Sequence, residues 1–194
     1  MVSTAVDYWH SEQQVLWHFL NRKWKEAVNW NEKSLAALDT LSASADNGYQ
    51  WKSRRLDGLL SRAYYLLYTG LTDPDAFNRS IAFTAQAEEY AEKEYPSYPY
   101  RDWLKTNLAH AYLLRNRPED RTRAIDIYRA FLTDTAYDSD HWELLQKDFR
   151  DLHRNGLRWP DLKSIIEAIK PPEAEMSGQD WREIGVDGPG AGNK

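Results

Sequence analysis

The stretch NLAHAYLLRNRPEDRTRAIDIYRAFL, residues 107–132, decides the fold class. Its apolar residues recur every three or four positions on both sides of a short charged turn, which is the spacing of two amphipathic helices. It contains no nucleophile pair, no glycine loop and no metal-ligand spacing. Two apolar faces side by side have to be buried against neighbouring elements. The stretch therefore predicts one unit of a stacked helical repeat, with no visible chemistry of its own.

The same helical period dominates the rest of the chain, and turn signals separate the segments. Gly70 is expected to end one helix in a left-handed conformation, and Gly156 is expected to terminate another. Asp138 and Ser139 are expected to cap the helix that follows them. The predicted helices cover residues 7–21, 23–42, 50–68, 72–94, 100–116, 118–133, 140–154 and 159–169. Alternation with period two is absent over any useful length, so we expect an all-α fold.

The pair Pro171 and Pro172 ends the segment with helical periodicity. Residues 1–170 are therefore expected to form one helical domain. Residues 171–194 contain five acids and two bases, a net charge of −3, and finish in the glycine-rich sequence GVDGPGAGNK. We expect this part to be a flexible acidic tail.

Composition limits the class of protein. The chain has 194 residues, no cysteine, nine tryptophans and twelve tyrosines, so it can bury a core but has no disulfide or thiolate chemistry. The opening MVSTAVDYWHSEQQ lacks a cationic start and an apolar core, and no run of about 18 apolar residues occurs. We expect a soluble, cytoplasmic protein without a secretory signal or a membrane span.

The charge distribution argues against a nucleic-acid partner. Of the net charge of −5, the tail supplies −3, which leaves the rest of the chain nearly balanced. Nucleic-acid binding depends mainly on neutralising phosphates, and no long basic stripe is present to do so. The basic run RNRPEDRTR at residues 115–123 is interrupted by acids and is interpreted as a solvated turn.

An internal similarity links two of the predicted helices. When Ala63 is aligned with Ala111, Tyr64 falls on Tyr112 and Leu60 on Leu108, at a separation of 48 residues. The position of Ser61 then corresponds to Ala109. Small residues there would let a neighbouring helix approach closely, while the tyrosine fills the space within a helix pair.

These residues resemble the tetratricopeptide repeat (TPR). The matching positions are Leu108, Ala109 and Tyr112 in one helix and Ala124, Tyr128 and Phe131 in the next. The sequence Trp24-Lys25-Glu26-Ala27 is similar to the opening of the second helix of that repeat. Because the separation exceeds the usual ~34 residues, the resemblance implies an irregular TPR-like array of antiparallel helix pairs, stacked as a right-handed solenoid.

The C-terminal helices resemble the closing segment of bacterial tetratricopeptide proteins. Trp142, Leu145, Phe149 and Leu152 form one apolar stripe of the kind that buries itself on the last repeat. The resemblance implies a capping helix pair and a protein of bacterial type.

The sequence offers little support for catalysis or a bound metal. His10 and His18 do not form a His-x3-His pair, and no Glu-x2-His pair occurs on any predicted helix. No Gly-x-Ser-x-Gly elbow and no phosphate-binding glycine loop is present. We therefore expect no cofactor and no catalysis, with a helical enzyme or metal protein kept as a further alternative.

In TPR-like proteins the concave face, lined by the first helix of each pair, is the usual binding surface. Carried over by register, the candidate residues are Arg55, Arg62, Tyr65, Trp103, Thr106 and His110. Arg55 and Arg62 are two turns apart, so both guanidinium groups could hold an acidic group of a partner. The alternative is that both form ion pairs with Asp57 or with glutamates of a neighbouring helix.

Tryptophans are enriched at interaction hot spots, so their burial matters. Trp17, Trp24 and Trp30 are expected to lie mostly in the core, whereas Trp9 and Trp51 could be exposed. The leading hypothesis is a scaffold or adaptor that binds a peptide or protein segment in its groove. A chaperone or immunity-type protein that sequesters one cognate partner is the alternative, and the oligomeric state is left open.

Overall fold

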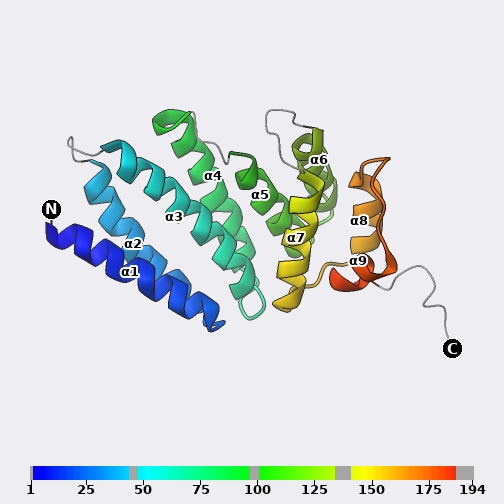
Figure 1. The fold of residues 1–194 in the computed structure, drawn as a ribbon, viewed down its shortest axis with the longest axis horizontal. Coiled ribbons are helices and arrows are strands. Elements are labelled where there is room, and N and C mark those ends of the chain that lie inside the picture. Colours follow the sequence, from blue (N-terminus) through cyan, green and yellow to red (C-terminus); the bar gives the residue numbers. More distant parts are fainter. Residues whose placement is uncertain (1, 44–47, 97–100, 134–140, 187–194) are drawn as a thin grey trace. The chain divides into compact units, whose positions relative to one another are not determined.

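The computed structural model describes residues 2–43, 48–96, 101–133 and 141–186. Within these ranges all regular secondary structure is helical and no strand occurs, so the all-α prediction is confirmed (Figure 1). The helices are α1 (Val2–Leu20), α2 (Trp24–Ser42), α3 (Gly48–Thr69), α4 (Ala76–Glu94), α5 (Arg101–Arg115), α6 (Asp120–Thr133), α7 (His141–Arg154), α8 (Leu162–Ile169) and α9 (Gly178–Glu183).

Most helix boundaries lie within two residues of the predicted ones. The largest differences are at α1, which begins at Val2 instead of Asp7, and at α4, which begins at Ala76 instead of Thr72. No glycine or proline interrupts the first residues of α1, so the helix extends toward the N-terminus. Before α4, the amide of Asp73 donates to Thr69 O at 3.0 Å and forms a turn. The predicted cap at Asp138 and Ser139 lies outside the described residues.

The chain divides into two compact units, Met1–Ala111 and Tyr112–Lys194. The expectation of one helical domain over residues 1–170 stays a prediction. The division falls inside α5, where the sequence has neither glycine nor proline to mark it. A boundary between compact units depends on which residues are in contact in the folded chain. The local helical pattern of the sequence does not indicate it.

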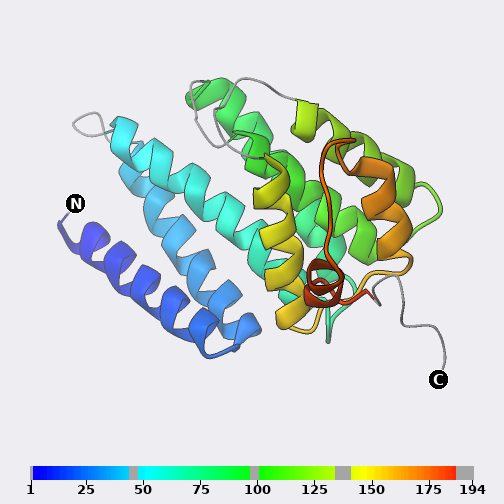
Figure 2. The same cartoon turned by 45° about the vertical axis from the view of Figure 1, so that its right-hand side comes forward.

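In the first unit, α1, α2, α3 and α4 follow one another side by side, each packed against the next in the chain (Figures 1 and 2). The apolar core is formed in layers between consecutive helices. One layer joins α1 to α2 and contains Tyr8, Ala37, Leu38 and Leu41. A second joins α3, α4 and α5 and contains Leu56, Leu59, Ala87, Ala91 and Leu104.

Small and polar residues set the close approaches between these helices. The buried Asn31 side chain donates to Gly58 O at 3.2 Å, where α2 crosses α3. A β-carbon at residue 58 would lie 2.9 Å from Leu35 Cδ2, so glycine allows this approach. On the other side of α3, Ser80 Oγ donates to Ala63 O at 2.7 Å. The amide nitrogen of Asn31 and the hydroxyl of Ser80 thus each find a backbone acceptor on the adjacent helix.

Two glycines expected at helix ends behave differently. Gly156 has φ 95°, which confirms the left-handed conformation predicted after α7. Gly70 does not adopt a positive φ, contrary to the prediction. It is needed for space, because a β-carbon there would lie 2.2 Å from the Phe77 ring.

In the second unit, α6 packs against α7 and α8. The rings of Tyr128 and Phe149 lie 5.7 Å apart, and Phe149 lies 5.3 Å from the Trp159 ring in an edge-to-face contact. Arg129 on α6 donates to Ala168 O at 2.9 Å and ties α6 to α8. Leu145, Phe149 and Leu152 of the predicted stripe are buried, whereas Trp142 is half-buried.

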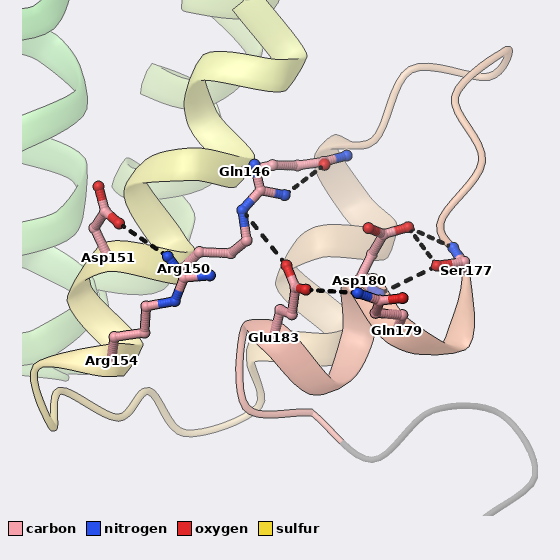
Figure 3. Close-up of polar contacts among 8 residues, drawn as sticks. All are labelled: Gln146, Arg150, Asp151, Arg154, Ser177, Gln179, Asp180 and Glu183. Carbon is pink, nitrogen blue, oxygen red and sulfur yellow. Dashed lines mark hydrogen bonds and ion pairs between the residues drawn. The ribbon is translucent and has the colours of Figure 1, made fainter.

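The described part of the segment assigned to a flexible tail contains a packed helix, α9. Trp181 and Ile184 are buried, so α9 is held by apolar contact. Ser177 and Asp180 form a reciprocal capping box at its start, with Ser177 N donating to Asp180 Oδ2 at 2.7 Å (Figure 3). Arg150 on α7 pairs with Glu183 at 3.8 Å (Figure 3). The two prolines and the acidic composition suggest a flexible segment. They give no indication that Trp181 is buried and packs α9 against the rest of the unit.

Candidate interaction surface

Arg62 is engaged within the first unit. Its side chain is 12% exposed, and it donates to Val28 O at 3.1 Å and to Glu32 Oε2 at 3.4 Å, both on α2. Its guanidinium carbon lies 4.7 Å from the centroid of the Phe83 ring on α4. The arginine therefore spans from α2 to α4 across α3.

Arg55, two turns away on α3, repeats this arrangement. Its Nε donates to Asp39 Oδ1 on α2 at 2.5 Å, and its guanidinium carbon lies 4.4 Å from the Tyr90 ring centroid on α4. Both guanidinium groups thus point the same way, as the seven-residue spacing predicts. Both also have intrachain acidic partners on α2. Arg62 pairs with a glutamate, as the alternative interpretation has it, whereas Arg55 pairs with Asp39, which that interpretation did not name.

The remaining candidates of the predicted groove offer little surface. Thr106 is 3% exposed and His110 is fully buried, so neither side chain is available to a partner in this conformation. Tyr65 is half-buried, with its ring 4.8 Å from that of Phe19, and burial raises the pKa of its hydroxyl. Trp103 belongs to α5, but its side chain lies outside the described part of the structure. Thr106 and His110 therefore offer no accessible side chain, and the role of the six residues as a partner-binding face stays a prediction.

Features typical of an active site are few among the described residues. Within the described residues, no group of three or more His, Asp or Glu side chains could hold a metal ion. In the second unit a cleft of about 230 Å³ lies between residues 158–163 and 184–186. Arg158 at its rim donates to His153 O and Leu157 O, both at 2.8 Å, so this cation is used to hold the adjoining loop. No described helix is long and apolar enough to cross a bilayer.

Five of the seven exposed large hydrophobic residues of the described chain lie on α1. Val6, Trp9, Leu16, Trp17 and Leu20 are between 46% and 70% exposed. With the exposed His10 and Gln13 they form one face of the helix, hereafter the α1 stripe. At about 100° per residue, these seven positions fall within an arc of about 120°. They are therefore neighbours on one continuous surface.

The opposite face of α1 is also apolar and is buried. Tyr8 is 3% exposed and Val15 is 3% exposed, and α1 packs on α2. An edge helix of a repeat array normally presents polar groups outward, because nothing else covers it. Here α1 is apolar on two sides, and the helices of the first unit leave the large apolar side chains of the second side about half or more exposed.

The α1 stripe corrects the interpretation of one tryptophan. Trp17 was expected in the core, but half of it is exposed and Lys23 Nζ lies 4.8 Å from its ring centroid. Trp9 is exposed, in agreement with the sequence analysis, with Arg54 stacked 4.5 Å from its ring centroid. The sequence does carry a signal for this exposed surface, because aromatic residues occur on both faces of α1. A helix that buries a single apolar stripe needs apolar residues on one face only.

Comparison of the chain with protein-family models, with curated proteins and with solved structures finds no match.

Proposed function

We propose that the protein is a non-catalytic interaction module, built as an irregular TPR-like array, that binds an apolar helix of a partner protein on the α1 stripe. The observation that supports this most strongly is the gathering of Val6, Trp9, Leu16, Trp17 and Leu20 on one exposed face. Exposed apolar patches larger than a few hundred Å² are typical of interaction sites in soluble proteins.

The composition of the stripe fits a binding surface better than a chance exposure. It holds two tryptophans, the residue type most enriched at hot spots, and three aliphatic side chains around them. The stripe holds no aspartate, glutamate, lysine or arginine, so docking a second apolar helix requires little desolvation of ions. Polar and charged residues flank it, as the rim of an interface does.

The packing of the first unit supports the helical-repeat part of the proposal. Arg55 pairs with Asp39, and Arg62, seven residues later, pairs with Glu32, seven residues earlier. Moving seven residues forward along α3 moves the ion-pair partner seven residues backward along α2, which is the register of two antiparallel helices. An array of that type ends in a helix whose outer side is free to dock a further helix in the same way.

Affinity capture from an extract of the native source tests the proposal. The double variant Leu16→Glu and Leu20→Glu places two carboxylates in the stripe, whereas Leu71→Glu alters an exposed leucine in the turn before α4 and serves as the control. We expect the wild-type and control chains to retain the same proteins and the stripe variant to lose them. Retention of an identical set by all three chains would refute the proposal.

A further inference from the structure

The spacing of the exposed residues along α1 is symmetric. Relative to Gln13, Trp9 and Trp17 lie four positions away in each direction, and Val6 and Leu20 lie seven positions away. His10 and Leu16 are related in the same way, at three positions. A helix turned end over end about Gln13 therefore presents the same pattern of large and small side chains. This is the property of a surface that pairs with itself across a two-fold axis.

We propose that the partner of the α1 stripe is the α1 stripe of a second copy of this chain, packed antiparallel with Gln13 on the two-fold axis. Residues Val6 and Leu20 of the two copies then meet, as do Trp9 and Trp17. The two Gln13 side chains face each other at the centre, where each amide can donate to the other carbonyl. The inference rests on the proposed function, because it names the occupant of the same surface.

The positions of the stripe repeat at intervals of three and four residues, with Val6, Gln13 and Leu20 each seven apart. Trp9 and Leu16 are apolar and seven apart. Val6 and Leu20 are fourteen apart around the polar Gln13. A seven-residue spacing of this kind is the seam by which two helices pack over several turns. The 19 residues of α1 correspond to a length of about 28 Å, enough for the five levels of the stripe at residues 6, 9–10, 13, 16–17 and 20. The helix is therefore long enough for a specific register.

Charge favours the antiparallel direction. Asp7 is exposed near the beginning of α1, while Arg22 and Lys23 are exposed just after its end. Antiparallel packing brings the acidic end of one helix beside the basic end of the other, and it also opposes the two helix dipoles. Parallel packing would instead place Asp7 against its own copy and the lysines against each other.

The exposed apolar area of the α1 stripe indicates how stable the proposed dimer should be. The five apolar side chains expose roughly 500 Å² per copy, so a symmetric contact buries about 1,000 Å², near the lower limit of specific interfaces. A dimer of this kind dissociates on dilution. Its detection therefore requires a concentration series.

Sedimentation equilibrium or light scattering on the full chain measures this directly. We expect a dimer at high concentration that becomes monomeric on dilution, and the Leu16→Glu and Leu20→Glu double variant should remain monomeric throughout with unchanged circular dichroism. Leu71→Glu should dimerise like the wild type. A wild-type chain that stays monomeric over the whole series overturns the inference, and so does a stripe variant that still dimerises.

Cross-linking tests the register, and the absence of cysteine from the sequence makes single-cysteine variants unambiguous. In the antiparallel pair Gln13→Cys meets its own copy, so an added mild oxidant should link it into a dimer. Val6→Cys lies about 21 Å from its own copy and should not link alone, but it should link when combined with Leu20→Cys. Cross-linking of Val6→Cys alone, as efficient as that of Gln13→Cys, overturns the antiparallel register.

The two proposals fail in distinguishable ways. If the wild-type chain is monomeric yet captures another protein through the stripe, the self-pairing is wrong and the proposed function stands. If the stripe variant changes neither self-association nor capture, the α1 stripe is not an interaction surface and both proposals are wrong.

Discussion

Both carboxylate oxygens of Asp120 accept hydrogen bonds from the guanidinium group of Arg115, at 2.6 and 2.8 Å. Asp120 is completely buried at the beginning of α6, and its Oδ2 also accepts from the backbone amide of Arg117 at 3.0 Å. The pair closes the turn between α5 and α6. The basic run interpreted as a solvated turn therefore contains a buried ion pair that fixes the turn's conformation.

Replacing this carboxylate isolates its contribution. Asp120→Asn keeps the shape of the side chain but removes the charge, which leaves the Arg115 guanidinium, with 14% of its side chain exposed, without its ionic partner. We expect the free energy of unfolding to fall by roughly 2–4 kcal/mol, as for other pairs broken by the loss of one buried partner. Denaturant unfolding measures it. Glu119→Gln, an exposed neutralisation one residue away, should change it by less than about 0.5 kcal/mol.

The same pair predicts an acid-dependent stability. Burial alone would raise the pKa of the Asp120 carboxyl, but the hydrogen bonds from Arg115 and from the Arg117 amide outweigh it and lower that pKa. An acid with a lowered pKa in the folded state stabilises the fold above its unfolded pKa, about 3.9, and this stabilisation is lost as the pH falls further. The stability difference between wild type and Asp120→Asn should thus be constant near neutral pH and shrink below about pH 4. A difference independent of pH down to 2 would contradict the assignment.

The helices could be predicted from the sequence because their boundaries depend on local signals. The end of α7 before Gly156 follows from such a signal. The roles of Arg62 and Asp120 could not be predicted, because an arginine two turns from another has the same spacing whether it faces solvent or bridges two helices. The partner of each side chain lies on another helix. The local helical pattern does not show how far the two helices are rotated about their axes, so it does not show which side chains meet.

The α1 stripe was missed for a related reason. Apolar periodicity identifies residues that avoid water but does not say which of two apolar faces the fold covers. Trp17 and Val15 are both apolar residues of one helix, yet only Val15 is buried, because α2 packs on that side alone. Whether a second helix covers the other face of α1 depends on how the helices are arranged in space, and the sequence pattern of α1 alone does not show this.

Arg62 is predicted to stabilise the first unit. Arg62→Ala removes the hydrogen bond to Val28 O, the ion pair with Glu32 and the contact with the Phe83 ring. We expect a loss of about 1–3 kcal/mol, most of it from packing and the bond to the backbone, because Glu32 is largely exposed. Arg79, which is 48% exposed and pairs with Asp73 at the surface, provides the matched control. Equal unfolding midpoints for Arg62→Ala and Arg79→Ala would show that the bridge between α2 and α4 is not stabilising.

Gly185 is predicted to be required for the docking of α9, because a larger residue at this position would collide with the His153 side chain. Its φ is 82°, a conformation that favours glycine, and a β-carbon there would lie 2.2 Å from Cε1 of His153 on α7. Gly185→Ala should therefore weaken the docking of α9 by roughly 1–3 kcal/mol, from backbone strain together with overpacking.

Hydrogen exchange of the amides of residues 178–186 measures this docking, and Gly178→Ala is the control. A β-carbon at residue 178 would approach only Arg182 Nη1, at 3.6 Å, which is an ordinary contact. Since alanine favours a helix over glycine by about 1 kcal/mol, Gly178→Ala should leave α9 as protected as in the wild type or more so. Faster exchange in Gly185→Ala alone would support a packed C-terminal helix. Equally rapid exchange in the wild type and both variants would mean that burial of Trp181 does not keep α9 docked in solution.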